Sequence, residues 1–271
     1  RANAPDLETA RAALRTEHAA EARVDLERVH PSWWVRGLQD ESRAVQRAVA
    51  SHGPPNVRAA LRRGLFLADD EIKPNQPPHP LALRWALNLW PERLVGGPAA
   101  RPDDPPVIFA ITGLNSVARL RLLVTVGLAK LAVALGPSET AAGLLGRDGL
   151  PMRQSDRVAH FQSLWGKSES RLVHLARIDL GTAKRAGDRI VSRLGLITVA
   201  RLLTVHEPHR VRWALQHIPY SVAKQVRSRM GLANPLLSAA ALIAWEERLV
   251  EMASQQLRTE GRSGSLREGQ A

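Results

Sequence analysis

Apolar residues recur at intervals of three to four along most of this 271-residue chain, which is the spacing of one face of an α-helix. Val57, Leu61 and Leu65, for example, follow a pair of prolines that suit the start of a helix. No convincing strand alternation appears, and residues 107–111 are the only short strand candidate. The pattern therefore predicts an all-α protein.

The expected helices are separated by prolines, glycines and polar residues, with polar, proline-rich loops at residues 69–78 and 96–106. We expect an N-terminal helical domain over residues 1–95, a linker over 96–106, a C-terminal domain over 107–258 and a disordered tail over 259–271. The expected helices span residues 6–29, 32–51 with a break near 40–42, a segment starting at 54, and 113–135, 138–145, 155–164, 169–178, 182–194, 196–205, 208–217, 219–230 and 234–257.

A 15-residue frame that begins with a proline and has a second proline at its twelfth position occurs twice without a gap. Residues 80–94 read PLALRWALNLWPERL and residues 208–222 read PHRVRWALQHIPYSV, while residues 31–45 fit the frame more loosely. A proline suits the first turn of a helix, so each frame predicts a tight helical hairpin. Such hairpins stack, which predicts an irregular α-helical repeat in an armadillo-like or superhelical array. The alternative is chance convergence of proline-started amphipathic helices.

The frame also carries a family resemblance. His30-Pro31 and His79-Pro80 are each expected to begin a helix. Leu83 and Leu87 lie three and seven residues after Pro80. This arrangement resembles the helical module of the flagellar motor switch protein FliG family, although the family's Glu and Gln on either side of His-Pro are absent here. The resemblance implies a cytoplasmic, stacking, protein-binding module of a flagellar or type III secretion base, with neighbouring ring subunits as partners.

The positive charge of the chain is regional. The sequence holds 38 Lys and Arg against 26 Asp and Glu, and residues 151–230 alone carry 15 basic and 5 acidic side chains. A basic surface attracts an acidic protein partner or nucleic acid by long-range electrostatics. An acidic protein is the partner that we favour, because no nucleic-acid motif is present. A third interpretation is compositional bias towards arginine on solvated helix faces.

The sequence contains no signature of catalysis or of a cofactor. Cysteine is absent, and His206 and His209 have the spacing of two metal ligands but lack a third. No Gly-x-Ser-x-Gly motif or phosphate-binding glycine loop occurs. We therefore expect no enzyme, no metal and no cofactor.

A membrane span is not expected, because Arg119, Arg121 and Lys130 interrupt the most apolar stretch, residues 107–135. The sequence thus predicts a cytoplasmic protein-interaction or scaffold module. The alternative is a nucleic-acid-binding protein. Either protein could form an oligomer. The candidate partner-binding residues are the tryptophan pair and the conspicuous positions of the frame and its basic surroundings: Trp33, Trp34, His79, Pro80, Arg84, Pro208, Arg212, Lys224 and Arg227.

Overall fold

The computed structural model describes residues 28–53, 55–68, 71–72, 104–136, 152–165, 170–184, 189–230 and 240–268. In these residues the secondary structure is helical and contains no strand, which confirms the all-α prediction. The chain divides into two compact units: unit 1 comprises Arg1–Arg101 and Pro208–Ala223, and unit 2 comprises Pro102–Glu207 and Lys224–Ala271. The segment Pro208–Ala223 thus belongs with the N-terminal part of the chain, and not to one continuous domain over residues 107–258.

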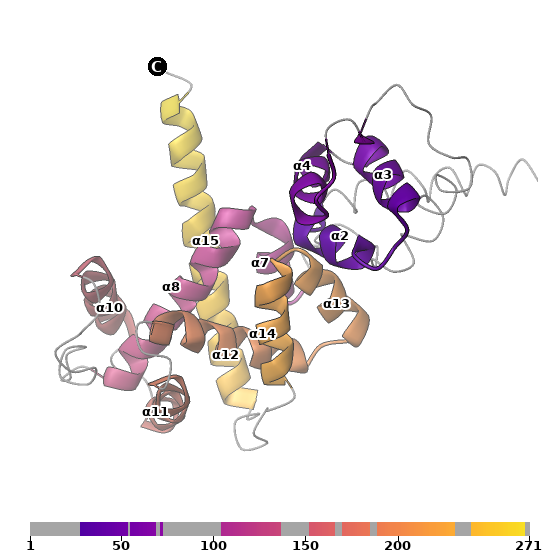
Figure 1. Cartoon of the computed structure of the whole chain (residues 1–271). Coiled ribbons are helices and arrows are strands. Elements are labelled where there is room, and N and C mark those ends of the chain that lie inside the picture. Colours follow the sequence, from indigo (N-terminus) through magenta and orange to yellow (C-terminus); the bar gives the residue numbers. More distant parts are fainter. Residues whose placement is uncertain are drawn as a thin grey trace, which may run out of the picture. The chain divides into compact units, whose positions relative to one another are not determined.

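The described helices of unit 1 are short, and all of them except α3 start at a proline or directly after one. His30 caps the first of them, because its Nδ1 accepts a hydrogen bond from the Ser32 N–H at 3.2 Å. The break expected near residues 40–42 separates the first two helices, and glycine follows the end of the second. The described helices of unit 1 (Figure 1) are α2 (Pro31–Leu38), α3 (Arg43–His52), α4 (Pro55–Gly64), α13 (Pro208–Gln216) and the first residues of α14 (Tyr220–Met230).

Backbone hydrogen bonds tie the start of α2 to the turn between α13 and α14. The His30 N–H donates to the Gln216 carbonyl at 2.8 Å, and the Tyr220 N–H donates to the Ser32 hydroxyl at 2.8 Å. Two of the three segments that share the proline frame therefore contact each other within unit 1, although they are far apart in the sequence. These bonds explain why Pro208–Ala223 joins the N-terminal part of the chain.

The core of unit 1 is rich in tryptophan. Trp213 of α13 is 1% exposed and belongs to the same buried cluster as Trp34 and Leu38 of α2 and Val57 and Leu61 of α4. Large aromatic rings compensate for the small number of residues that helices this short can bury. The predicted apolar face of α4 is thereby confirmed.

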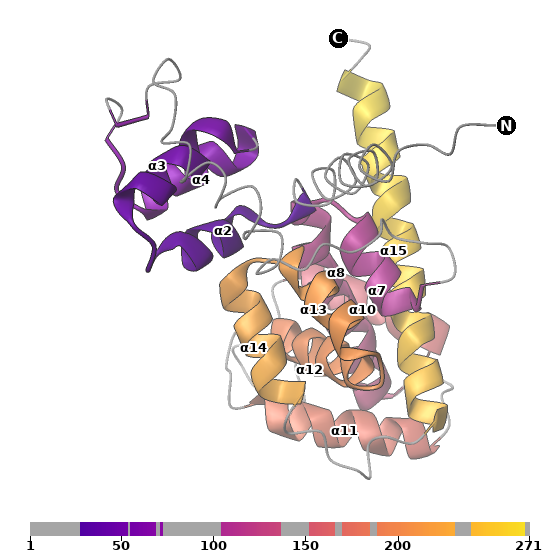
Figure 2. The ribbon, with the colours of Figure 1, turned by 90° about the vertical axis from the view of Figure 1, so that its right-hand side faces the viewer.

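Unit 2 is organised around one long helix. α8 contacts α10, α11, α12 and α15, and every one of its residues from Thr125 to Leu135 is buried. Its neighbour α15 extends past the ends of the other helices in this unit (Figure 2). The described helices of unit 2 are α7 (Pro106–Gly113), α8 (Ser116–Leu135), α10 (Met152–Trp165), α11 (Ser170–Lys184), α12 (Ile190–Thr204) and α15 (Ala240–Glu268), and α14 belongs to this unit from Lys224 onwards.

Two glycines allow α8 and α12 to touch backbone to backbone. A Cβ added to Gly127 would lie 1.9 Å from the Val191 carbonyl oxygen, and one added to Gly195 would lie 1.9 Å from the Leu123 carbonyl oxygen. Each helix therefore presents a glycine to the main chain of the other. Any larger side chain at either position would force the helices apart.

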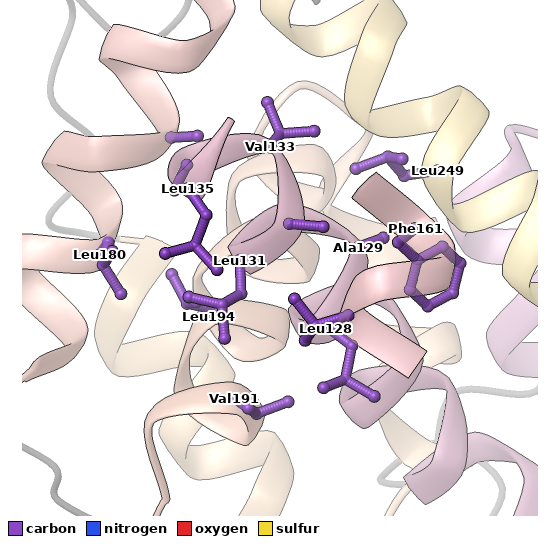
Figure 3. Close-up of a cluster of buried hydrophobic side chains, with 14 of the residues drawn as sticks. Leu128, Ala129, Leu131, Val133, Leu135, Phe161, Leu180, Val191, Leu194 and Leu249 are labelled. Atoms are coloured by element: carbon purple, nitrogen blue, oxygen red, sulfur yellow. The ribbon is translucent and has the colours of Figure 1, made fainter. Parts of the chain in front are cut away.

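The apolar core of unit 2 surrounds this crossing. Figure 3 shows Leu128, Leu131 and Leu135 of α8 beside Val191 and Leu194 of α12. Side chains of α10, α11 and α15 complete the cluster, so α8 is covered by apolar contacts from several directions. A helix that is buried this completely reads as apolar almost throughout, as the sequence of α8 does.

Several predicted boundaries differ from those in the structure. Residues 107–111, the strand candidate, lie in α7, which Pro106 starts and whose Thr112 hydroxyl donates to the Ile108 carbonyl at 2.9 Å. The helix expected from residue 113 begins instead at Ser116, because the Asn115 side chain accepts a hydrogen bond from the Ala118 N–H at 2.8 Å. A local capping residue decides this boundary.

Helices α12 and α15 differ most from the prediction. The glycine at 195 suggests a break between two helices, but α12 is continuous over Ile190–Thr204. Gly195 does not end a helix; it allows α12 to pack against the main chain of α8. α15 ends at Glu268, beyond the end expected near residue 257, so residues 259–268 are helical rather than a disordered tail. Directly before this stretch, the guanidinium of Arg258 lies 4.2 Å from the centre of the Phe109 ring and joins α15 to α7.

Candidate interaction surface

The predicted partner-binding residues of α13 and α14 are all exposed: Pro208, Arg212, Lys224 and Arg227. Lys224 and Arg227 are three residues apart on α14 and therefore share a face of that helix. Arg212 follows Val211, which is buried, so that α13 directs an apolar residue inwards and a basic residue outwards. Three further predicted residues lie outside the described part of the chain: His79, Pro80 and Arg84.

The two adjacent tryptophans have different environments. Trp34 is only 4% exposed and lies in the core of unit 1. Trp33 is half-buried, its indole N–H donates to the Ile218 carbonyl at 2.9 Å, and its ring meets that of Tyr220 edge to face at 5.1 Å between centroids. One tryptophan is thus partly exposed, as predicted, but it is held by its own unit. A role for either in binding a partner stays a prediction.

Basic side chains from α12 and α14 come close together in unit 2. Burial lowers the pKa of the Arg229 guanidinium, and the positive charge of Arg193 lowers it further. Neither α14 nor the first turn of α12 contains an acidic residue. Because like charges repel, an anion placed beside these groups lowers their energy. We call Arg193, Lys224, Arg227 and Arg229 the basic surface.

Part of the positive charge of this region serves the fold instead. Arg177 donates from Nε to the Ala134 carbonyl at 2.9 Å, and Arg157 donates from Nη2 to the Thr125 hydroxyl at 2.9 Å. Arg201 is buried. The charge available to a partner is therefore smaller than the sequence count suggests.

Four charged side chains meet in the interior of unit 2. Arg201 of α12 donates to both carboxylate oxygens of Asp179 of α11 at 2.7 and 2.8 Å and to Glu246 Oε1 of α15 at 2.5 Å. Lys130 of α8 pairs with the same two carboxylates and donates to the Thr198 hydroxyl at 3.1 Å. We call these four residues the buried ion network; each comes from a different helix.

The two carboxyl groups of the network differ. Burial favours the neutral form of both, but Lys130 and Arg201 hold the pKa of Asp179 below its usual range. For Glu246, burial outweighs the same two cations and raises the pKa. Consistent with this, Glu246 Oε2 is buried and has no hydrogen-bond partner. All four side chains are almost inaccessible to solvent, so the network positions helices and does not face a substrate.

The two histidines with metal-ligand spacing, His206 and His209, have different surroundings in the structure. Burial lowers the pKa of His206, while the charge of Glu247 opposes this shift. His209, its predicted companion, is exposed on α13. Across the described stretches, no group of three or more histidine or acidic side chains is arranged to hold a metal ion.

Exposed apolar side chains occur in both units. Phe66 is 87% exposed in unit 1, and the described part of unit 2 exposes the large apolar side chains of Val117, Leu120, Leu164, Ile178 and Val205. Ile178 and its sequence neighbour Arg177 are both exposed on α11, so this helix presents apolar and basic groups to solvent. Such mixed surfaces are common at protein interfaces.

Sequence reasoning missed both the ion network and Phe66. Lys130 was the available signal for the network, because it stands alone in an otherwise apolar run and needs a buried acidic partner. Its partners Asp179 and Glu246 lie on other helices and can be matched only by tertiary structure. Phe66 follows an apolar helical pattern, which gives no sign that its side chain points outwards.

No known protein family, curated protein or solved structure matches this chain. Of the helices in the described residues, none is long and apolar enough to cross a membrane.

Proposed function

We propose that this chain is a non-enzymatic protein-interaction module of the cytoplasm whose basic surface binds an acidic protein partner. The observation that carries the proposal is the exposure of Lys224 and Arg227 on one face of α14, a helix that contains no acidic residue. Arg229 of the same helix adds a basic side chain whose pKa is lowered by burial and by the charge of Arg193 on α12. A carboxylate-rich partner would relieve the repulsion between these groups.

An acidic protein fits this surface better than nucleic acid does. A protein that tracks a phosphate backbone gathers its basic side chains along the path of that backbone. Here Arg157, Arg177 and Arg201 make hydrogen bonds within unit 2, and Arg201 is buried, which leaves a more limited positive surface. Exposed apolar residues such as Ile178 also suit a protein contact. The resemblance of the proline frame to the FliG module supports a flagellar or type III secretion base as the setting.

Affinity capture from native lysate, with and without nuclease, tests the proposal. The bait is the full chain, compared with a double variant of the basic surface, Lys224→Glu with Arg227→Glu. The matched control is Arg121→Glu with Arg248→Glu, which removes two exposed arginines of unit 2 elsewhere on α8 and α15. Both double variants change the net charge equally, so any difference between them reports position.

We expect an acidic protein to be recovered with and without nuclease. The amount recovered should fall at least 10-fold with the basic-surface variant and should not change with the control. Salt dependence measured on the purified pair adds a second criterion, because each phosphate contact to nucleic acid steepens the fall of affinity with salt. Recovery that disappears on nuclease treatment would favour nucleic acid. Equal losses for the two double variants would show non-specific charge attraction and overturn the proposal.

A further inference from the structure

The turn after α4 displays a single large aromatic side chain to solvent. Phe66 is 87% exposed, whereas its neighbours Leu65 and Leu67 are 7% and 6% exposed and belong to the core of unit 1. Phe66 also has φ 52°, in the left-handed region, which costs a residue with a Cβ about 1–2 kcal/mol. The backbone therefore adopts an unfavourable conformation that points a phenylalanine outwards.

Arg43 holds this conformation in place. Its Nη1 donates to the Leu65 carbonyl at 2.9 Å and its Nη2 to the Phe66 carbonyl at 2.8 Å. The Leu67 N–H donates to the Arg62 carbonyl at 3.0 Å, which continues the hydrogen bonding of α4 into the turn. The main chain on either side of Phe66 is thus fixed before any partner binds.

Glu71 completes the support. It accepts hydrogen bonds from Arg43 at 2.7 Å, from the Ala68 N–H at 2.8 Å and from Arg47 Nε at 3.1 Å. These donors lower the pKa of Glu71 to about 2, with the bond from Arg43 the largest cause. The carboxylate stays ionised near neutral pH and keeps Arg43 in the orientation that supports the turn.

The surroundings of Phe66 on α3 and α4 are basic. These two helices contain five arginines and no acidic residue, and Arg62 and Arg63 lie exposed in the last turn of α4, four and three residues before Phe66. Asp69 and Asp70 lie outside the described residues. Glu71 already pairs with Arg43 and Arg47, so Arg62 and Arg63 supply the exposed charge beside Phe66, and this charge favours a partner with carboxylates.

We propose that Phe66 is an anchor for an acidic protein segment, which would surround the ring with apolar side chains and pair its carboxylates with Arg62 and Arg63. Preorganisation of the turn reduces the entropy lost on binding, and aromatic and arginine side chains often dominate binding energy. One phenylalanine is too small a hydrophobic group for stable membrane attachment, so a protein fits better than a lipid surface. This surface lies in unit 1 and is independent of the basic surface proposed above.

Peptide display provides the test. A library of random 12-residue peptides on phage is selected on the full chain, with an excess of a Phe66→Gly variant as soluble competitor. Glycine suits the left-handed backbone, so this variant keeps the turn and removes only the ring. We expect the enriched peptides to combine Asp or Glu with large apolar residues.

Variants of the chain then separate the elements of the proposal. Fluorescence anisotropy with one enriched peptide should show at least 10-fold weaker binding for Phe66→Gly, near-normal binding for Phe66→Tyr, and a loss of several fold for Arg62→Glu with Arg63→Glu. Leu164→Ser, at an exposed apolar position of unit 2, is the matched control and should leave binding unchanged. Circular dichroism of each variant checks that it is folded.

Three outcomes would overturn the inference. The first is the absence of enrichment over the Phe66→Gly competitor, and the second is a set of enriched peptides without acidic residues. The third is sedimentation of the chain with vesicles of phosphatidylcholine and phosphatidylserine (4:1) that depends on Phe66, which would identify a membrane surface instead. The basic-surface variant of α14 should bind the selected peptides normally, so a failure here and a failure of the proposed function are distinguishable.

Discussion

The two units use arginine–carboxylate interactions in opposite ways. In unit 2, Arg201 and Lys130 pair with Asp179 and Glu246 in the interior, where water cannot replace a lost partner. In unit 1, Arg43 and Arg47 share one carboxylate at the surface, where solvent weakens each interaction but the arrangement holds a turn. The same chemical groups thus join helices in one unit and shape a surface in the other.

The difference follows from the length and composition of the helices. Unit 2 has long apolar helices that bury charged groups deeply, and once buried, each charge requires a partner. Unit 1 has helices of 8 to 10 residues in its N-terminal part, which leave most of their arginines exposed. Breaking a charged pair should therefore destabilise unit 2 strongly and unit 1 weakly.

Glu246→Ala should produce the largest effect. It leaves Lys130 and Arg201 with only Asp179 in the interior, and loss of one partner from a buried pair costs about 3–5 kcal/mol. Hydrogen exchange read by mass spectrometry should show faster exchange in α8, α11 and α12, with unit 1 protected as before. Glu251→Ala, an exposed position on the same helix, is the control. A change smaller than about 1 kcal/mol would show that the network contributes little.

Gly127→Ala should rank second. The added methyl group would clash with the Val191 carbonyl, and overpacking of this kind costs about 1–3 kcal/mol. The control is Gly181→Ala on α11, where nothing lies within 4 Å of the added Cβ. That substitution should raise stability by about 0.5–1 kcal/mol, because alanine favours the helix. Urea denaturation distinguishes the two by the opposite signs of their midpoint shifts.

Trp33→Phe should have a smaller effect, confined to unit 1. Phenylalanine keeps an aromatic ring beside Tyr220 but removes the hydrogen bond to the Ile218 carbonyl, worth about 1 kcal/mol. Hydrogen exchange should accelerate in residues 208–223 and not in α8 or α12. Tyr220→Phe keeps the edge-to-face contact and serves as the control. Faster exchange throughout unit 2 would contradict the confinement.

Protonation of Glu71 should have the smallest effect on the whole chain, and the most local. The pKa of Glu71 is lowered from 4.5 to about 2 by Arg43, the Ala68 N–H and Arg47. Its contribution to stability is complete above the ordinary carboxyl pKa and is lost as the pH falls from about 4.5 to about 2. Hydrogen exchange of residues 62–72, corrected for the intrinsic pH dependence, should show the turn opening in that window. Glu71→Gln should remove the transition.

Local features of the sequence predicted much of the fold. Proline at the start of α2, α4 and α13, and the apolar spacing of Val57, Leu61 and Val211, located helices and their buried faces without reference to the rest of the chain. The errors arose where a residue has a local meaning and a tertiary use. Gly195 suggests a helix end by propensity but permits a backbone contact in the structure.

The candidate surfaces were predictable to different degrees. The exposed positions of Lys224, Arg227 and Arg212 follow from charge and helical spacing. The proximity of Arg193 to Arg229 does not, because it depends on how α12 and α14 pack. Phe66 was beyond prediction because its outward direction results from Arg43, which lies 23 residues earlier in the chain.

By itself, the sequence determined the helical class, most helix starts and the sign of the charge, because propensity, capping and hydrophobic spacing act within a few residues along the chain. The tertiary structure decided that Pro208–Ala223 joins the N-terminal unit, that four charges meet in one interior and that Phe66 points outwards. Each of these depends on atoms from distant segments that meet only when helices pack, and local patterns carry no information about that pairing.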